Sequence, residues 1–542
     1  MSRTEDTPLM QQWREVKSRH QDALVFFRVG DFYELFYGDA EEGSRLLGLT
    51  LTSRNNGAAS RVPLAGVPVK ALDEYLARLV KIGRRVAICE QVEDPAQARG
   101  IVKREVVETV TPGTVLADAL LTARRNNYLV AVTPSRDGMR GMAALDLSTG
   151  ELTVREVAED VLADELGRLE PRELLLPASA REPGGDPPLA RALEAAGEPP
   201  ARTHRDAWVF DLDVTREALE RRYGVQSLDG FGFQARDGLL VRAAGALVAY
   251  VEEIRPGGAE HLRPPRILRP GDAMVLDDMT RRNLELVEPL RSGVEGGTLL
   301  DVLDDTVTAM GARLLRRWVL SPLVSAPAIW RRQDGVRALA EDPELRRTLR
   351  DRLSGIADLE RLAGKVGSAR VGPRELLGLG RSLARLPEVK EAVSGVESGI
   401  LHDLGRELDV LDDVRDLLER AVHQDAPANL QDGGVIAPGW SGELDEAREV
   451  RDGARDFIAS LQARERERTG IGSLKVGFNK VFGYYLEVTK ANLDRVPEDY
   501  HRKQTLANAE RYFTPELKEW EEKVVGAEER IAALEAELFT EV

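Results

Sequence analysis

The sequence contains very few of the residues from which disulfide frameworks and metal centres are built. Its 542 residues include a single cysteine, Cys89, and six histidines, none of them at the spacing of metal ligands. A disulfide within the chain is therefore excluded, as is a zinc site built on paired cysteines. Cys89 ends the apolar run Val86–Cys89, which predicts a small buried side chain rather than a reactive thiol.

Signatures of common catalytic sites are also missing. The sequence has no G-x-x-x-x-G-K-[S/T] loop, and Ala363–Val366 lacks the first glycine and the hydroxyl residue of that loop. A G-x-S-x-G motif is absent, and Gly230–Phe233 lacks the third glycine of a dinucleotide site. We therefore expect no enzyme activity, catalytic residues, metal site or cofactor in this chain.

Long hydrophobic runs are absent as well. Residues 1–12 are polar, and the most apolar window, Gly238–Ile254, is interrupted by Arg242 and by two glutamates. We expect a cytoplasmic protein that does not enter a membrane. The net charge is −17, from 75 Lys and Arg against 92 Asp and Glu, which argues against a uniformly basic surface but not against local basic patches.

The residues that are present predict several folded domains. At about 150 residues per domain the length corresponds to three or four domains, and 42% hydrophobic residues suffice to form their cores. Residues 1–116 mix helices and strands, as in an α+β domain, and end near a Pro-Gly turn. Residues 123–255 contain three short strands with hairpin turns, followed by helices, which predicts an α/β domain.

The second half of the chain is predominantly helical. Turn signals separate a series of helices from residue 276 onward. Two long helices, expected over Glu443–Arg468 and from Pro515 onward, flank a β-hairpin around Asn479-Lys480. The last helix carries apolar residues at heptad spacing over Leu517–Leu538, which we interpret as antiparallel helix packing. Because this helix reaches the last residue without a capping glycine, we expect the natural protein to be longer.

Two basic regions interrupt the acidic chain. Ten Lys or Arg stand against five Asp or Glu between Arg54 and Arg104, and ten stand against seven between Arg464 and Arg511. Each region could be an ordinary solvated surface. Basic regions at two separated places also suit a protein that holds a nucleic-acid backbone from two sides.

The most specific local feature is the segment Gly30–Phe36, in which two aromatic residues and a carboxylate follow a Gly-Asp turn. One interpretation is an aromatic core segment. The other is a wedge, because an exposed phenylalanine such as Phe32 can enter between base steps and kink a duplex. DNA phosphates repel a neighbouring carboxylate such as Glu34, so that group makes sense only as the acceptor of a base N–H.

Two other function classes remain open. Asp146, at the end of a predicted strand, could hold Mg²⁺ in a metal-dependent nuclease, but such a site needs several converging carboxylates, and capping of the turn at Ser148–Gly150 is the alternative. A non-catalytic coiled-coil scaffold could self-associate through the seam Leu517–Leu538.

The segment Phe26–Phe36 resembles the mismatch-recognition motif of the bacterial MutS family. The likeness continues, in order, at Pro63–Pro68, Ala87–Gln91, Val110–Thr114, Met279–Leu286, Leu474–Asn479, Phe482–Tyr485, Thr505–Tyr512 and Pro515–Lys518.

The resemblance implies a multidomain α/β plus all-α protein with four domains. These are an α+β mismatch-recognition domain over 1–117, an RNase H-like α/β connector without nuclease activity over 118–255, a helical core with long lever helices over 262–432 and 508–542, and a DNA clamp with a β-hairpin at its tip over 433–507.

The resemblance also implies site residues. Phe32 would stack on the mismatched base from the minor-groove side and Glu34 would hydrogen-bond to it, while Gly30 and Tyr33 would shape the loop. The clamp residues that match DNA-contacting regions of the family are Lys475, Asn479, Lys503, Asn508 and Arg511.

The partners that the resemblance implies are double-stranded DNA with mismatches or small insertion/deletion loops, a second copy in a homodimer, and a MutL-type protein. ATP and Mg²⁺ would bind in an ATPase domain that this chain does not contain, since it has no phosphate-binding loop. The expected location is the cytoplasm, in association with the nucleoid.

Overall fold

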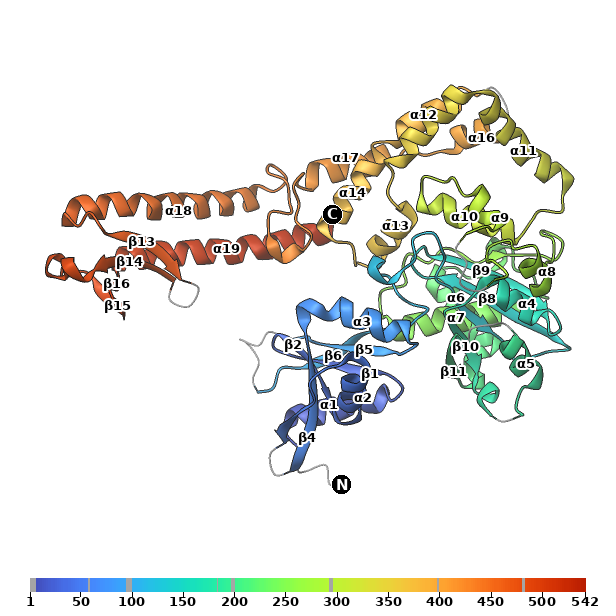
Figure 1. Cartoon of the computed structure of the whole chain (residues 1–542), viewed down its shortest axis with the longest axis horizontal. Coiled ribbons are helices and arrows are strands. Elements are labelled where there is room, and N and C mark those ends of the chain that lie inside the picture. Colours follow the sequence, from blue (N-terminus) through green and yellow to red (C-terminus); the bar gives the residue numbers. More distant parts are fainter. Residues whose placement is uncertain are drawn as a thin grey trace. The chain divides into compact units, whose positions relative to one another are not determined.

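The computed structural model describes residues 6–56, 59–93, 100–182, 184–195, 200–291, 296–396, 399–479 and 483–542 (Figure 1). Contacts within the chain divide it into two compact units. The first comprises Met1–Val371 and Pro387–Leu408, and the second comprises Gly372–Leu386 and Asp409–Val542. Within the described ranges, no helix is both long and apolar enough to cross a membrane.

The N-terminal part of the first unit is a six-stranded sheet with helices on both faces. Its elements are α1 (Pro8–Arg19), β1 (Leu24–Val29), β2 (Phe32–Phe36), α2 (Tyr37–Leu47), β3 (Thr52–Asn56), β4 (Ala59–Pro68), α3 (Leu72–Lys81), β5 (Val86–Gln91) and β6 (Arg104–Val110). The strand order is β3-β4-β2-β1-β5-β6, and β1 with β5 is the parallel pair. Helices α2 and α3 pack on one face and α1 packs on the other.

The mixture of helices and strands predicted for this part is confirmed. The β3–β4 hairpin and α2 were not anticipated by the sequence pattern. Strand β3 reads Thr-Ser-Arg-Asn-Asn, which has no apolar alternation, so its pairing with β4 determines its conformation. Helix α2 ends at Gly48, whose φ of 72° is the left-handed conformation that favours glycine.

The next part of the first unit is a second mixed sheet. Its elements are β7 (Leu129–Val132), β8 (Met139–Asp146), β9 (Glu151–Ala158), α4 (Leu162–Leu169), β10 (Glu173–Pro177), α5 (Pro187–Ala195), β11 (Ala201–Arg205), α6 (Leu212–Tyr223), α7 (Gly238–Ile254) and β12 (Arg266–Ile267). The order is β11-β10-β7-β8-β9-β12. Helices α4 and α5 cover one face, and α6 and α7 cover the other. The three strands predicted from hairpin turns are the antiparallel set β7–β9.

Helices that follow the second sheet contact the linker between the two sheets. The other helices up to residue 408, apart from one described below, are α8 (Asp278–Asn283), α9 (Leu299–Leu303), α10 (Ala309–Leu320), α11 (Ala326–Glu341), α12 (Pro343–Ser354), α13 (Leu359–Gly367), α15 (Leu386–Ser394) and α16 (Ile400–Glu407). Arg361 of α13 donates to the carbonyls of Thr122 and Arg125, and Lys365 pairs with Asp118 at 2.7 Å. These bonds join both sheets and the first core helices in one unit.

The second unit consists of helices and one four-stranded sheet. Its elements are α14 (Pro373–Leu383), α17 (Asp412–Ala421), α18 (Gly442–Thr469), β13 (Lys475–Asn479), β14 (Gly483–Thr489), β15 (His501–Thr505), β16 (Ala509–Phe513) and α19 (Pro515–Glu541). Figure 1 shows α18 and α19 side by side, with the sheet β13-β14-β16-β15 at one end of the pair. The predicted hairpin turn includes Lys480, which lies outside the described residues.

The predicted domain boundaries differ from these groupings in two places. The boundary at 507/508 falls inside the β15–β16 hairpin, so the sheet continues to Phe513. The predicted core 262–432 is divided between the two units near residue 371. The four-domain division and the RNase H-like topology stay predictions.

The two long helices pack against each other along the predicted seam. Thr514 caps α19 by accepting a hydrogen bond from the amide of Leu517 at 3.1 Å, and Phe457 stacks on Trp520 with ring centroids 4.2 Å apart. Val524 is buried in the same core as Ile458 of α18. The interpretation as antiparallel packing is confirmed, because residues of α18 cover this seam within the chain.

Candidate nucleic-acid interface

The turn between β1 and β2 presents Phe32 at the start of β2. Gly30 has a φ of 60°, in the region that favours glycine. Val29 pairs with Phe32, and the amide of Val69 donates to the carbonyl of Asp31 at 3.0 Å. The turn is therefore fixed by both neighbouring strand ends.

Phe32 is exposed although the aromatic residues around it are buried. Its side chain is 47% exposed, against 2% for Tyr33 and 0% for Phe36. Alternate residues of a strand point to opposite faces, so Tyr33 enters the core under α2 and α3, whereas Phe32 and Phe36 share the other face. Helix α1 covers Phe36 through Trp13 but leaves Phe32 uncovered. The core interpretation is correct for Tyr33 and Phe36 and wrong for Phe32.

The ring of Phe32 rests on the backbone of β4. β4 presents Gly66 opposite Glu34, the residue two positions beyond Phe32. A β-carbon on Gly66 would lie 3.5 Å from Cδ1 of Phe32, which is ordinary van der Waals contact. The ring is thus supported on one side and open to a ligand on the other.

Glu34 lies beside Phe32 on the same face, between two arginines. Nη1 of Arg54 donates to Oε2 of Glu34 at 2.7 Å. Arg104 of β6 approaches on the same face: its Nε donates to the carbonyl of Arg28 at 2.6 Å, and its guanidinium lies 5.4 Å from the ring centroid of Phe27, the strand partner of Glu34. Burial raises the pKa of Glu34 above its usual value, and the charges of both arginines offset part of that rise.

Tyr33 is anchored from the opposite face of the sheet. Its hydroxyl donates to Glu90 of β5, and Arg28 lies 5.5 Å from its ring centroid while pairing with Glu90 at 3.5 Å. Burial and the carboxylate raise the pKa of Tyr33. Gly30 and Tyr33 therefore hold the loop, whereas Phe32 and Glu34 face outward.

The sheet at the end of the long helices places three of the five predicted clamp residues on one face. Val476 and Leu486 point toward α18 and α19, so Lys475 and Asn479 point to the outer face. Arg511 joins them there because it pairs with Glu487, which is opposite Lys475.

Arg511 is engaged within this outer face. It pairs with Glu487 at 3.0 Å, and its guanidinium lies 4.0 Å from the ring centroid of Tyr485. A β-carbon on Gly477 would lie 2.7 Å from that ring, so Tyr485 lies directly over the backbone of β13. Arg511 thus orders the surface, while the exposed Lys475 is open to a ligand.

Lys503 and Asn508 lie in the β15–β16 hairpin. A register shift between Arg502 and Gln504 makes Lys503 the extra residue of a bulge, and its Nζ lies 5.6 Å from the ring centroid of Phe513. Asn508 is exposed in the turn and accepts a backbone hydrogen bond from Lys490 at 3.1 Å.

Asp146 has the surroundings of a turn cap. It is fully buried; Oδ1 accepts from the hydroxyl of Ser148 at 2.6 Å, and Oδ2 accepts from Nδ2 of Asn126 at 2.7 Å. Among the described residues there is no cluster of three or more His, Cys, Asp or Glu that could hold a metal. The geometry supports the turn-capping interpretation of Asp146 over the nuclease interpretation.

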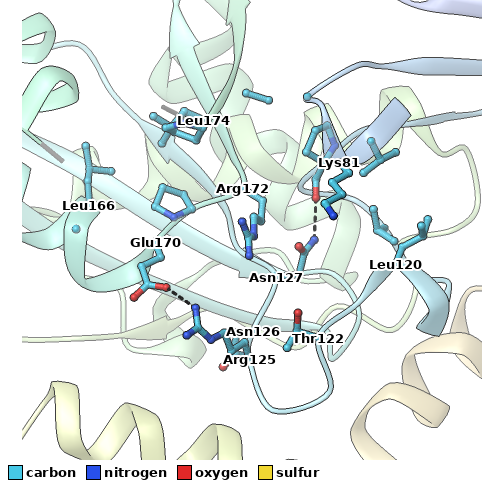
Figure 2. A pocket seen from close by; sticks show the side chains of 18 of the residues that line it. Lys81, Leu120, Thr122, Arg125, Asn126, Asn127, Leu166, Glu170, Arg172 and Leu174 are labelled. Carbon is cyan, nitrogen blue, oxygen red and sulfur yellow. Dashed lines mark hydrogen bonds and ion pairs between the residues drawn. The ribbon is translucent and has the colours of Figure 1, made fainter. Parts of the chain in front are cut away.

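A cavity of about 1240 Å³ lies in the first unit at the linker between the sheets (Figure 2). Arg125 on its wall pairs with Glu170 at 3.4 Å, and Nδ2 of Asn127 donates to the carbonyl of Pro112 at 3.0 Å. Both side chains already bind neighbouring groups of the protein, so we assign the cavity to the junction of the two N-terminal parts.

Together these features define a multidomain protein whose candidate site is an open surface rather than an enclosed catalytic centre. Three family models match the chain: MutS domain I over residues 7–119, MutS domain II over 127–263 and MutS domain III over 279–542. The chain belongs to the MutS family and carries its domains I to III.

Curated relatives agree with this assignment. The DNA mismatch repair protein MutS of Symbiobacterium thermophilum is 46% identical over 542 residues, covering 99% of this chain and 61% of the relative. The protein of that name from Methanothrix thermoacetophila is 46% identical over 539 residues, covering 99% and 60%. The one from Chlorobaculum tepidum is 44% identical, covering 99% and 61%. The chain thus spans about three fifths of the length of these relatives.

Sequence reasoning missed the partners of the candidate site residues. Arg54 and Arg104 entered it only as part of a local charge excess, and Glu90 and Gly66 were not assigned to the site. The resemblance at Pro63–Pro68 and Ala87–Gln91 was the available signal, because these segments contain Gly66 and Glu90.

Proposed function

We propose that this chain recognises mispaired or unpaired bases in duplex DNA as the DNA-binding part of a mismatch repair protein. The observation that carries the proposal is the exposure of Phe32 beside Glu34, at the end of a strand whose other aromatic residues are buried. An exposed ring on a supported strand end can be pushed between base steps, which costs a few kcal/mol of unstacking.

The discrimination comes mainly from the DNA. A mispaired or unpaired step unstacks and bends at lower cost than a paired step, so Phe32 enters there more readily. Glu34 then accepts a hydrogen bond from a base N–H that lacks its normal partner. A fully paired duplex presents a higher cost of entry and no free donor.

The clamp residues Lys475, Asn479, Lys503, Asn508 and Arg511 would hold the DNA backbone without reading its sequence. Exposed Lys475 and the bulge at Lys503 support direct phosphate contact, while Arg511 supports the surface through Glu487 and Tyr485. The homodimer, a MutL-type partner and ATP-dependent switching, expected from the resemblance, remain predictions for the longer family proteins.

The test compares binding of the chain to a duplex carrying a G·T pair or one unpaired thymine and to its matched twin, by fluorescence anisotropy at one stated salt concentration. We expect tighter binding to the defective duplex. Phe32→Ala should remove this preference and leave binding to the matched duplex nearly unchanged.

Trp208→Ala is the control, because Trp208 is another large exposed aromatic side chain, at 59%, and lies in the 3₁₀ turn Ala207–Phe210 of the second sheet part. It should leave the preference intact. An unchanged preference in Phe32→Ala would exclude Phe32 as the wedge.

A further inference from the structure

In the DNA-free protein the carboxylate of Glu34 is paired with Arg54, although the proposed function requires the same carboxylate to accept a hydrogen bond from the mismatched base. The side chain of Glu34 is 17% exposed and that of Arg54 is 39% exposed, so the pair lies at the surface of the site. Arg54 reaches Glu34 from β3, across β4, on the face that also carries Phe32. Its guanidinium is therefore close to any duplex that Phe32 enters.

DNA and Glu34 compete for the same cation. A carboxylate near the phosphate backbone is repelled, and an arginine beside it can neutralise either the carboxylate or a phosphate. Arg104 on the other side of Glu34 is tied to the carbonyl of Arg28 and to the ring of Phe27. The side chain of Arg54 is 39% exposed and is free to move to a phosphate.

We propose that Arg54 is a specificity-determining residue: it is the counter-ion of Glu34 in the DNA-free protein and exchanges that carboxylate for a DNA phosphate when a mispaired or unpaired base donates to Glu34. This inference rests on the proposed function of Phe32 and Glu34. On a matched duplex the ion pair persists, because no base releases Arg54. One phosphate contact is then made on the defective duplex and not on the matched one.

The salt dependence of binding measures this difference. Each phosphate neutralised by a protein cation contributes a slope of about −0.9 to the plot of log K against log salt for B-DNA. We expect the slope of the unmodified chain to be steeper by about that amount on the G·T duplex than on its matched twin. Arg54→Gln should make the two slopes equal and reduce the preference for the G·T duplex by about tenfold, the effect of losing one charged hydrogen bond.

Two further variants separate this role from general charge loss. Arg54→Lys keeps the charge and should retain most of the slope difference. Arg61→Gln removes one exposed positive charge from β4, the strand between those of Arg54 and Glu34. It should leave the slope difference intact.

Glu34→Gln tests the pair from the other side. Without the carboxylate, Arg54 is available to both duplexes, so the slope on the matched duplex should steepen by about 0.9.

If Arg54 instead contacts a phosphate on every duplex, the two slopes of the unmodified chain are equal, and Arg54→Gln makes both less steep by the same amount. Either of these results, or an effect of Arg54→Gln no different from that of Arg61→Gln, overturns the inference while the preference for defective DNA stands. A chain without that preference overturns the proposed function itself.

Discussion

Glu173 accepts a hydrogen bond from the backbone amide of Gly113 at 3.1 Å and is itself completely buried. The carboxylate also accepts from the hydroxyls of Thr203 and Tyr250, at 2.7 Å each, and from the hydroxyl of Thr111. A β-carbon on residue 113 would lie 2.8 Å from Cβ of Glu173, so only glycine fits there. The segment that follows the first sheet is thereby docked onto the second.

We expect Glu173→Gln to loosen this docking. A glutamine turns an N–H₂ group toward at least one of the four donors, which lowers the free energy of local opening by about 2 kcal/mol. Hydrogen exchange of the amides between residues 106 and 116, followed by mass spectrometry, measures the opening. Glu194→Gln, at an exposed position of α5, makes the same charge change and should leave the exchange unaltered. Equal exchange in both variants would contradict the anchoring role of Glu173.

Cys89 should be unreactive in the native chain. It is fully buried, and burial raises the pKa of its thiol to about 12. At pH 8 the thiolate fraction is then roughly a thousandfold below that of a free cysteine, whose pKa is about 8.5. Titration with a thiol-specific chromogenic disulfide should detect no thiol in the native chain and one per chain in urea. Fast labelling at pH 8 without denaturant would contradict the buried placement of β5.

Lys503→Ala should weaken binding to matched and mismatched duplexes equally. Its side chain lies in a bulge on the edge strand β15, and we expect it to contact a phosphate, which carries no sequence information. The slope of log K against log salt should become less steep by about 0.9 on both duplexes. Lys518→Ala, which removes an exposed lysine from α19, is the matched control and should preserve both slopes. A change in the mismatch preference itself would contradict a backbone role for Lys503.

The first unit should lose stability in mild acid through His261. Its Nε2 lies 2.6 Å from the carbonyl of Leu147, and burial lowers the pKa of its imidazole below the usual value of about 6.5. The unfolded chain therefore binds the proton more readily, so this stability is complete above about pH 6.5 and decreases as the pH falls toward the native pKa. The loss is at most about 1.4 kcal/mol per pH unit.

Thermal unfolding at pH 7.5 and pH 5.5 measures the effect of His261. His261→Gln removes the titration and should narrow the difference between the two melting temperatures. His501→Gln, at an exposed position of β15, should not. Identical pH dependence in both variants would exclude His261 as the source.

Local sequence patterns determined the long elements of this protein. The long helices expected over Glu443–Arg468 and from Pro515 onward are consistent with α18 and α19, because each signal lies within one segment. The hairpin β3–β4 carries no such signal, because its conformation depends on pairing with β2.

The sequence by itself determined the residue types of the candidate site: a glycine turn, two adjacent aromatic residues and a carboxylate. Only the tertiary structure decided that Phe32 is exposed and Tyr33 buried, since that depends on which face of the sheet α1 leaves uncovered. It also decided that Arg54, twenty positions away, pairs with Glu34. Such contacts depend on strand order and register, which bring together residues whose separation in the chain carries no periodic signal.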